Sequence, residues 1–317
     1  MKKEPRIGHY VPRMIEEWKQ IQSKVRRKPT VPSGVAIDSS CGLILNVLEK
    51  AVCYTVTEAA FHLVWQTDLA SVETENQRLP YPVMAIEYDF DYGELGVPQE
   101  KLDKIQELAL KRIILLVEIS DTQFALMSAY HPQSNEVQLQ WAVAPISIVF
   151  TYEMLNTMEE WYFISDDLSL NLGIGGPGQP SVTAALPMFE DTVSDMDSET
   201  AEIIMKDMAD ELRVAFGMLG ILSCSNAPIE KVAPPAKLNK KREKAGKAPI
   251  PTYRTLHVTD HTSRSNGSSG GSHSSPRTHW RRGHIRNQPT AKGVIRKWIK
   301  PTIIGGGDAP KPEVVLT

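Results

Sequence analysis

Residues 278–288, THWRRGHIRNQ, carry the side chains with the most evident chemical uses in this sequence. His279 and His284 exchange protons near neutral pH, and the arginines beside them suit phosphate groups. Together they could serve as acid, base and phosphate clamp in metal-independent RNA cleavage. Five positions separate the two histidines, so a regular strand places them on opposite faces. Cleavage would therefore also require a bulge at Gly283.

A second use of the same stretch is binding without cleavage. As a β-strand, it alternates so that one face carries Trp280, Arg282, His284 and Arg286. Residues 293–300, GVIRKWIK, alternate likewise and place Arg296, Trp298 and Lys300 on one face. The intervening NQPTAKG suits a hairpin loop, and pairing residue 284 with residue 296 aligns the two patterns. The hairpin would then present two indole rings among five basic groups.

Such a surface favours single-stranded nucleic acid, because cations neutralise phosphates and tryptophan stacks on bases. The basic segment over residues 237–247 supports this interpretation. The expected nucleic-acid-binding residues are Trp280, Arg281, Arg282, His284, Arg286, Arg296, Lys297, Trp298, Lys300, Lys240, Lys241 and Arg242. The alternatives are a structural hairpin that packs its tryptophans on the body, and a module that docks on an acidic partner or on a second copy of the chain.

Carboxylates provide another candidate site. Glu87, Asp89 and Asp91 alternate in IEYDFDYGE and would line one strand face. Three carboxylates can hold Mg²⁺ or Mn²⁺ for phosphoryl chemistry, which makes a nuclease an alternative function. The simpler interpretation is the solvent-facing side of a half-buried strand.

Other patterns are weaker. Gly173, Gly175 and Gly178 have GxGxxG spacing, but prolines follow where a dinucleotide site requires a helix. No histidine spacing fits a closed zinc site, and the three cysteines are expected to be buried reduced thiols. We therefore expect no cofactor and no metal, and the catalytic residues of any activity stay unknown.

Charge is distributed unevenly along the chain. Residues 231–300 hold 17 Lys and Arg against two acids, whereas residues 1–230 hold 17 against 34. A basic C-terminal part that follows an acidic body points to a polyanionic ligand or to docking on an acidic surface. The sequence has no signal-peptide pattern and no long apolar run, so a cytoplasmic location in a host cell and no membrane are expected.

The elements that would position these residues predict an α+β fold with a mostly antiparallel sheet and a basic C-terminal β-hairpin module. Helices are expected from Met14 to Lys28, where Pro29 stops the helix, from Asp38 or Ser39, over 98–111 and over 198–223. Strands are expected over 82–90, 112–120, 123–130, 137–150 and 161–165.

Changes in amino-acid composition along the chain predict four segments. They are an acidic body (1–225), a basic connector (226–253), the hairpin module (254–304) with a flexible Ser/Gly-rich insert (262–276), and a flexible tail (305–317).

The C-terminal third resembles a group of uncharacterised bacteriophage and prophage proteins. The matching elements are the Asn-Lys-Lys-Arg segment at 239–242, the His-x-Arg-Arg-Gly-His-x-Arg hairpin at 279–286 and the Trp-Ile pair at 298–299. A looser match covers LPYPVMAIEYDF. The resemblance implies an origin in phage or prophage and no particular mechanism.

Overall fold

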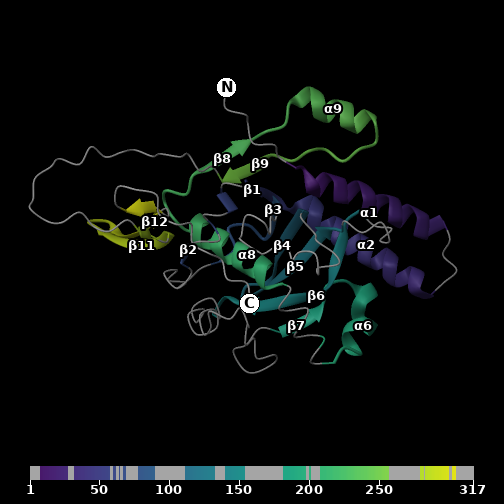
Figure 1. Cartoon of the computed structure of the whole chain (residues 1–317). Coiled ribbons are helices and arrows are strands. Elements are labelled where there is room, and N and C mark those ends of the chain that lie inside the picture. The colour runs from purple at the N-terminus through teal and green to yellow at the C-terminus, as the bar shows by residue number, and fades with distance from the viewer. Residues whose placement is uncertain are drawn as a thin grey trace, which may run out of the picture.

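A computed structural model describes most of the chain (Figure 1). The described residues are 8–27, 32–57, 60–61, 64, 67–68, 78–89, 111–132, 140–153, 181–197, 200, 208–256, 279–281, 283–299 and 302–304. At its centre lies an eight-stranded sheet of order β7-β6-β5-β4-β3-β1-β9-β8. Its strands are β1 (Val52–Val56), β3 (Val83–Asp89), β4 (Lys111–Ser120), β5 (Gln123–His131), β6 (Ala142–Thr151), β7 (Ser181–Ala184), β8 (Ile229–Val232) and β9 (Tyr253–Leu256).

The sheet is mostly antiparallel, as expected. Only β1 runs parallel to its neighbours, with Tyr54 level with Ile86 of β3 and with Arg254 of β9. The central strands are apolar on both faces because helices cover both sides of the sheet. Together with the helices, this sheet confirms the α+β class.

One face of the sheet is covered by α1 (Tyr10–Arg27) and α2 (Pro32–Lys50). The apolar stripe of α1 buries Met14 and Trp18, and the Trp18 indole donates to the Trp141 carbonyl at 3.3 Å. The start expected for the second helix is wrong, because α2 begins at Pro32. Proline fits the first turn of a helix, whose amides have no helical partner there. A short 3-10 turn (Pro187–Phe189) lies beside α2, and α6 (Glu190–Ser194) follows it and contacts β6 and β7.

The opposite face is covered by α8 (Ala209–Leu222), which buries Leu212, Val214 and Phe216 in the core on this side of the sheet. A buried ion pair of 2.5 Å joins Arg112 of β4 to Glu211 of α8. It provides the charge compensation that an arginine at the centre of a sheet requires. The helix expected over 198–223 is thus confirmed where it is described.

The basic connector is structured. Strand β8 runs along the sheet edge, α9 (Ala236–Lys244) follows, and β9 returns between β8 and β1. The sheet therefore contains strands from both sides of the boundary expected at residue 225. Figure 1 shows β8 and β9 between α9 and the C-terminal strands.

The C-terminal strands form two small sheets. β10 (His279–Arg281) pairs with β13 (Thr302–Ile304), while β11 (Gly283–Thr290) pairs with β12 (Gly293–Ile299) and with β2 (Thr67–Asp68). The expected hairpin exists, but its two strands run into the segment expected to be its loop.

Several expected elements lie outside the described residues. They are most of the helix over 98–111, the strand over 161–165, the three glycines of the GxGxxG pattern, the Ser/Gly-rich insert and the tail. Lys111 itself begins β4 rather than ending a helix. In the part of the chain that can be described, no helix is long and apolar enough to cross a membrane.

Candidate nucleic-acid interface

The register of the hairpin differs from the expected one. His284 pairs with Ile299 rather than with Arg296, and the ladder ends at Thr290 and Gly293. Two residues, Ala291 and Lys292, make the turn, and Gly293 takes a φ of 117°, which suits glycine. The shift of three positions is odd, so it moves every side chain of β12 to the other face relative to β11.

This register overturns the expected stacking role of Trp298. Trp298 lies opposite Ile285, and both side chains are buried in the core beneath α8. The Asn226 side chain holds the same residue by its backbone, accepting from the Trp298 amide at 2.8 Å and donating to the Trp298 carbonyl at 3.0 Å. Trp298 therefore anchors the hairpin to the body.

Arg296 also lies on the body side of the hairpin. It shares the strand face of Trp298, and its carbonyl accepts from the amide of Ser225 at 3.0 Å. The opposite face carries His284 and Arg286 of β11 and Lys297 of β12, with Arg286 and Lys297 directly opposite each other. Arg286 is exposed, and His284 and Lys297 are half-buried. This outer face keeps three of the expected basic residues together.

The remaining expected residues of the hairpin are distributed differently. Trp280 and Arg281 belong to β10, where Trp280 pairs with Ile303 of β13. Arg282 and Lys300 lie outside the described residues. The single strand expected over 279–286 is thus replaced by two strands in two different sheets. His279 and His284 fall on either side of this division, so no common ladder joins them.

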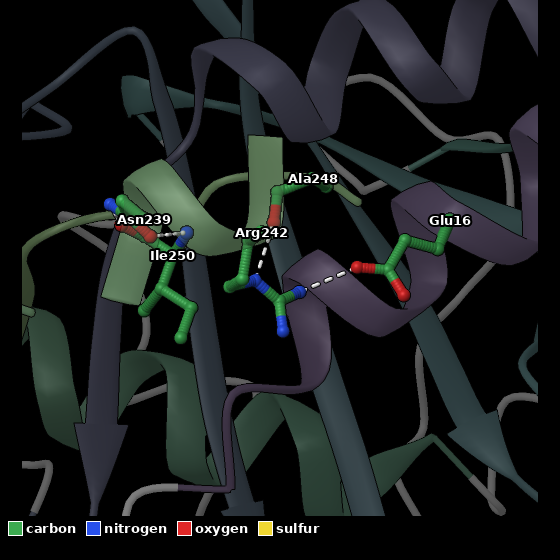
Figure 2. A network of polar contacts seen from close by, with 5 residues as sticks. All are labelled: Glu16, Asn239, Arg242, Ala248 and Ile250. Carbon is green, nitrogen blue, oxygen red and sulfur yellow. Dashed lines mark hydrogen bonds and ion pairs between the residues drawn. The ribbon is translucent and has the colours of Figure 1, made fainter. Parts of the chain in front are cut away.

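Helix α9 is fixed to the body by two of its nine residues, Asn239 and Arg242 (Figure 2). The Asn239 side chain pairs with the backbone of Ile250, accepting from its amide and donating to its carbonyl, each at 2.9 Å. Arg242 donates to the Ala248 carbonyl at 2.8 Å and pairs with Glu16 of α1 at 2.5 Å. These contacts give Arg242 a structural position instead of the expected solvent-facing one.

The other side of α9 is a row of lysines. Lys237, Lys240, Lys241 and Lys244 recur at intervals of three and four, so they share one helix face, and all are exposed. Lys247, just after the helix, is exposed too. Within the described structure, none of these five lysines has an ion-pair partner. We call them the α9 lysine face.

Of the candidate carboxylates, Glu87 is buried rather than solvent-facing, whereas Asp89 at the end of β3 is exposed. Glu87 is 1% exposed, and its carboxylate accepts from the Tyr253 hydroxyl at 2.5 Å and from the Val11 amide at 2.7 Å. Asp89 accepts from the hydroxyl of Tyr10. The carboxylate of Glu87 thus caps the start of α1, whose first amides need acceptors. Asp91 lies outside the described residues.

Burial sets the proton affinity of Glu87. It raises the pKa of this carboxyl to about 7, although the hydrogen bonds from Tyr253 and from the amides of Val11 and Tyr10 act in the opposite direction. A buried carboxylate with a raised pKa was predicted neither by the nuclease interpretation nor by the interpretation as a solvent-facing strand. The partners of these carboxylates are Tyr10 for Asp89 and Tyr253 for Glu87, and both tyrosines are too far away in the sequence for a local pattern to reveal the pairing.

Sequence reasoning also missed Asn226 and the anchoring role of Asn239 and Arg242. The Asn-Lys-Lys-Arg segment at 239–242 is the feature of the sequence that could indicate such an anchor. Its spacing of three between Asn239 and Arg242 was compatible with a shared helix face.

Comparison of the sequence with known protein families gives a match. The model of the anti-CRISPR type V subtype A2 family (AcrVA2-like) matches residues 54–306. The chain belongs to this anti-CRISPR family. The match begins in β1 and extends past β13, so it includes the hairpin and α9 and leaves out α1 and α2. Membership in the anti-CRISPR family is consistent with the phage-type protein implied by the resemblance. The curated proteins and the solved structures provide no match to the chain.

Proposed function

We propose that this protein inhibits a type V CRISPR system and does so by binding RNA through its basic C-terminal part. The family name supplies the first half of the proposal. The second half rests on one observation: the α9 lysine face is exposed and has no acidic partner among the described residues. CRISPR effectors are guided by RNA, so an RNA-binding inhibitor has a ligand to compete for.

The way in which α9 is held supports this assignment. Like charges at intervals of four destabilise a helix by about 0.2–0.5 kcal/mol per pair, and a nine-residue helix has little intrinsic stability. Asn239 and Arg242 nevertheless anchor α9 with the lysines on the outside. A fixed row of cations matches the regularly spaced phosphates of a nucleic acid backbone.

The outer face of the hairpin extends the proposed interface. Arg286 and Lys297 lie directly opposite each other, and His284 lies on the same face. With Trp298 in the core, aromatic stacking by this residue is excluded from the proposal. Contacts to phosphates then predominate, and we expect weak sequence preference.

Binding of a labelled single-stranded RNA to the full chain tests the proposal. We expect binding that weakens steeply between about 50 and 200 mM salt, because each neutralised phosphate of a single strand contributes about −0.7 to the slope of log K against log salt. The variant K237Q/K240Q/K241Q/K244Q should lose affinity and about 3 units of that slope. A matched control, K19Q/K24Q/R26Q/R27Q, removes the same charge from exposed positions of α1.

Equal loss in both variants would attribute binding to net charge alone and would contradict a role for α9. Absence of RNA binding at low salt, combined with salt-sensitive self-association, would favour docking on a second copy instead. Restoration of phage plating in cells with a type V CRISPR system tests the inhibitory half, and the α9 variant should lose it.

A further inference from the structure

Arg254, in the second strand from the sheet edge, has an unusual environment. Its guanidinium carbon lies 4.8 Å from the ring centroid of Tyr81 and 5.8 Å from that of Tyr54. One nitrogen donates to the Tyr81 hydroxyl at 3.2 Å. The two rings define the position of a side chain that is only half-buried.

Within the described structure, no carboxylate lies within ion-pair distance of Arg254. Tyr54 does not compensate the charge, since burial raises its pKa to about 12 and its hydroxyl stays neutral. A guanidinium has five N–H donors, and one of them is used here. The remaining donors are available to a ligand.

A second cation lies beside the first. Lys231 of the edge strand β8 is directly opposite Arg254 in the antiparallel pair, so both side chains project from the same face of the sheet. Lys231 is exposed. Like charges in directly opposite positions destabilise a sheet. Lys231 and Arg254 break this local rule, and among the described residues no carboxylate pairs with either of them, which points to a functional role.

The pair also lies between the two basic elements of the proposed interface. Asn226, which holds the hairpin, precedes β8 by three residues, and α9 begins four residues after β8 ends. Lys231 and Arg254 are therefore placed at the same sheet edge, between the hairpin and α9, along the two strands that connect them (Figure 1).

We propose that Arg254 and Lys231 form a phosphate-binding site that receives one backbone phosphate of single-stranded RNA, with the Arg254 guanidinium as a preoriented two-pronged donor. This inference rests on the RNA binding proposed above. The planar fork of arginine matches two phosphate oxygens, which a lysine at the same position cannot do. Tyr81 and Tyr54 are positioning residues, because they contact the guanidinium and not the ligand.

The test is binding of a labelled single-stranded RNA 20-mer to the full chain at several salt concentrations. R254Q should bind about tenfold more weakly and lower the salt slope by about 0.7, the contribution of one phosphate. K231Q should weaken binding by a smaller factor. R254K keeps the charge and loses the fork, so its slope should stay near that of the wild type while its affinity falls. K19Q, which removes an ion-paired charge from α1, is the matched control.

Thermal midpoints and circular dichroism establish that each variant is folded. If R254Q and K231Q bind like the wild type while the α9 variant does not, this site is wrong and the proposed function stands. An R254K variant with wild-type affinity would overturn the two-pronged contact. A wild-type chain that binds no RNA would overturn both proposals.

Discussion

The Glu87 carboxylate of β3 accepts a 2.5 Å hydrogen bond from the Tyr253 hydroxyl of β9, across the intervening strand β1. The same oxygen accepts from the Val11 amide at 2.7 Å. One buried side chain therefore connects three elements that are distant in sequence: β3, β9 and the start of α1. Stability should depend on this carboxylate in a way that pH can reveal.

Stability should fall as the pH rises from about 4.5 to about 7 through the titration of Glu87. Its pKa is raised by burial to about 7 from 4.5, so the native state holds the proton more tightly than the unfolded state over this interval. The change in free energy of unfolding is on the order of 3 kcal/mol. In E87Q, which keeps an oxygen for Val11 and Tyr253, this contribution should vanish. Denaturant melts of both proteins across the interval measure it.

The difference between wild type and E87Q is the relevant quantity. Burial lowers the pKa of His9, so that residue contributes a stability that rises with pH through its own titration. His9 is present in both proteins and cancels in the difference. Parallel pH profiles for the two proteins would show that Glu87 does not titrate in this range.

Replacing Trp298 should destabilise the fold. W298A empties a site that is 2% exposed and contacts the core beneath α8, and such truncations typically cost about 3–5 kcal/mol. V294A provides a control on the same face of the same strand, because Val294 is 66% exposed. Urea denaturation measures both, and a W298A variant as stable as V294A would contradict the buried anchor.

Asn226 should be needed to dock the hairpin. N226A leaves the amide and the carbonyl of Trp298 without this partner, which costs about 1–3 kcal/mol for a buried group. N226D keeps the acceptor and loses the donor, so its stability should fall between those of N226A and the wild type. A ranking in which N226D equals N226A would show that acceptance from the Trp298 amide contributes nothing.

The anchors of α9 should control its helicity. N239A and R242A each remove side-chain contacts that hold the helix, so amide hydrogen exchange over residues 236–244 should accelerate in both variants. L238A, which truncates a 40% exposed side chain of the same helix, should leave exchange nearly unchanged. Equal protection in all three variants would mean that α9 does not depend on these contacts.

Local patterns determined much of the fold. The spacing of Met14, Trp18 and their apolar neighbours predicts α1, and the apolar runs predict β3, β4, β5 and the later part of β6. These elements follow from periodicity, because a buried stripe or a buried strand leaves its repeat in the sequence. The α+β class follows from their order. The charge asymmetry is likewise a property of the sequence alone.

Tertiary structure decided which polar residues face outward. In β12, a two-residue turn sets the register and carries Trp298 to the side of Ile285, where alternation by itself allowed either face. Arg242 and Glu16 are 226 positions apart, and Glu87 and Tyr253 are 166 apart. Pairings at such separations leave no periodic signal. Whether a charged side chain of α9 anchors the fold, as Arg242 does, or is exposed to a ligand, as the lysines are, is decided by the packing of α9 against α1.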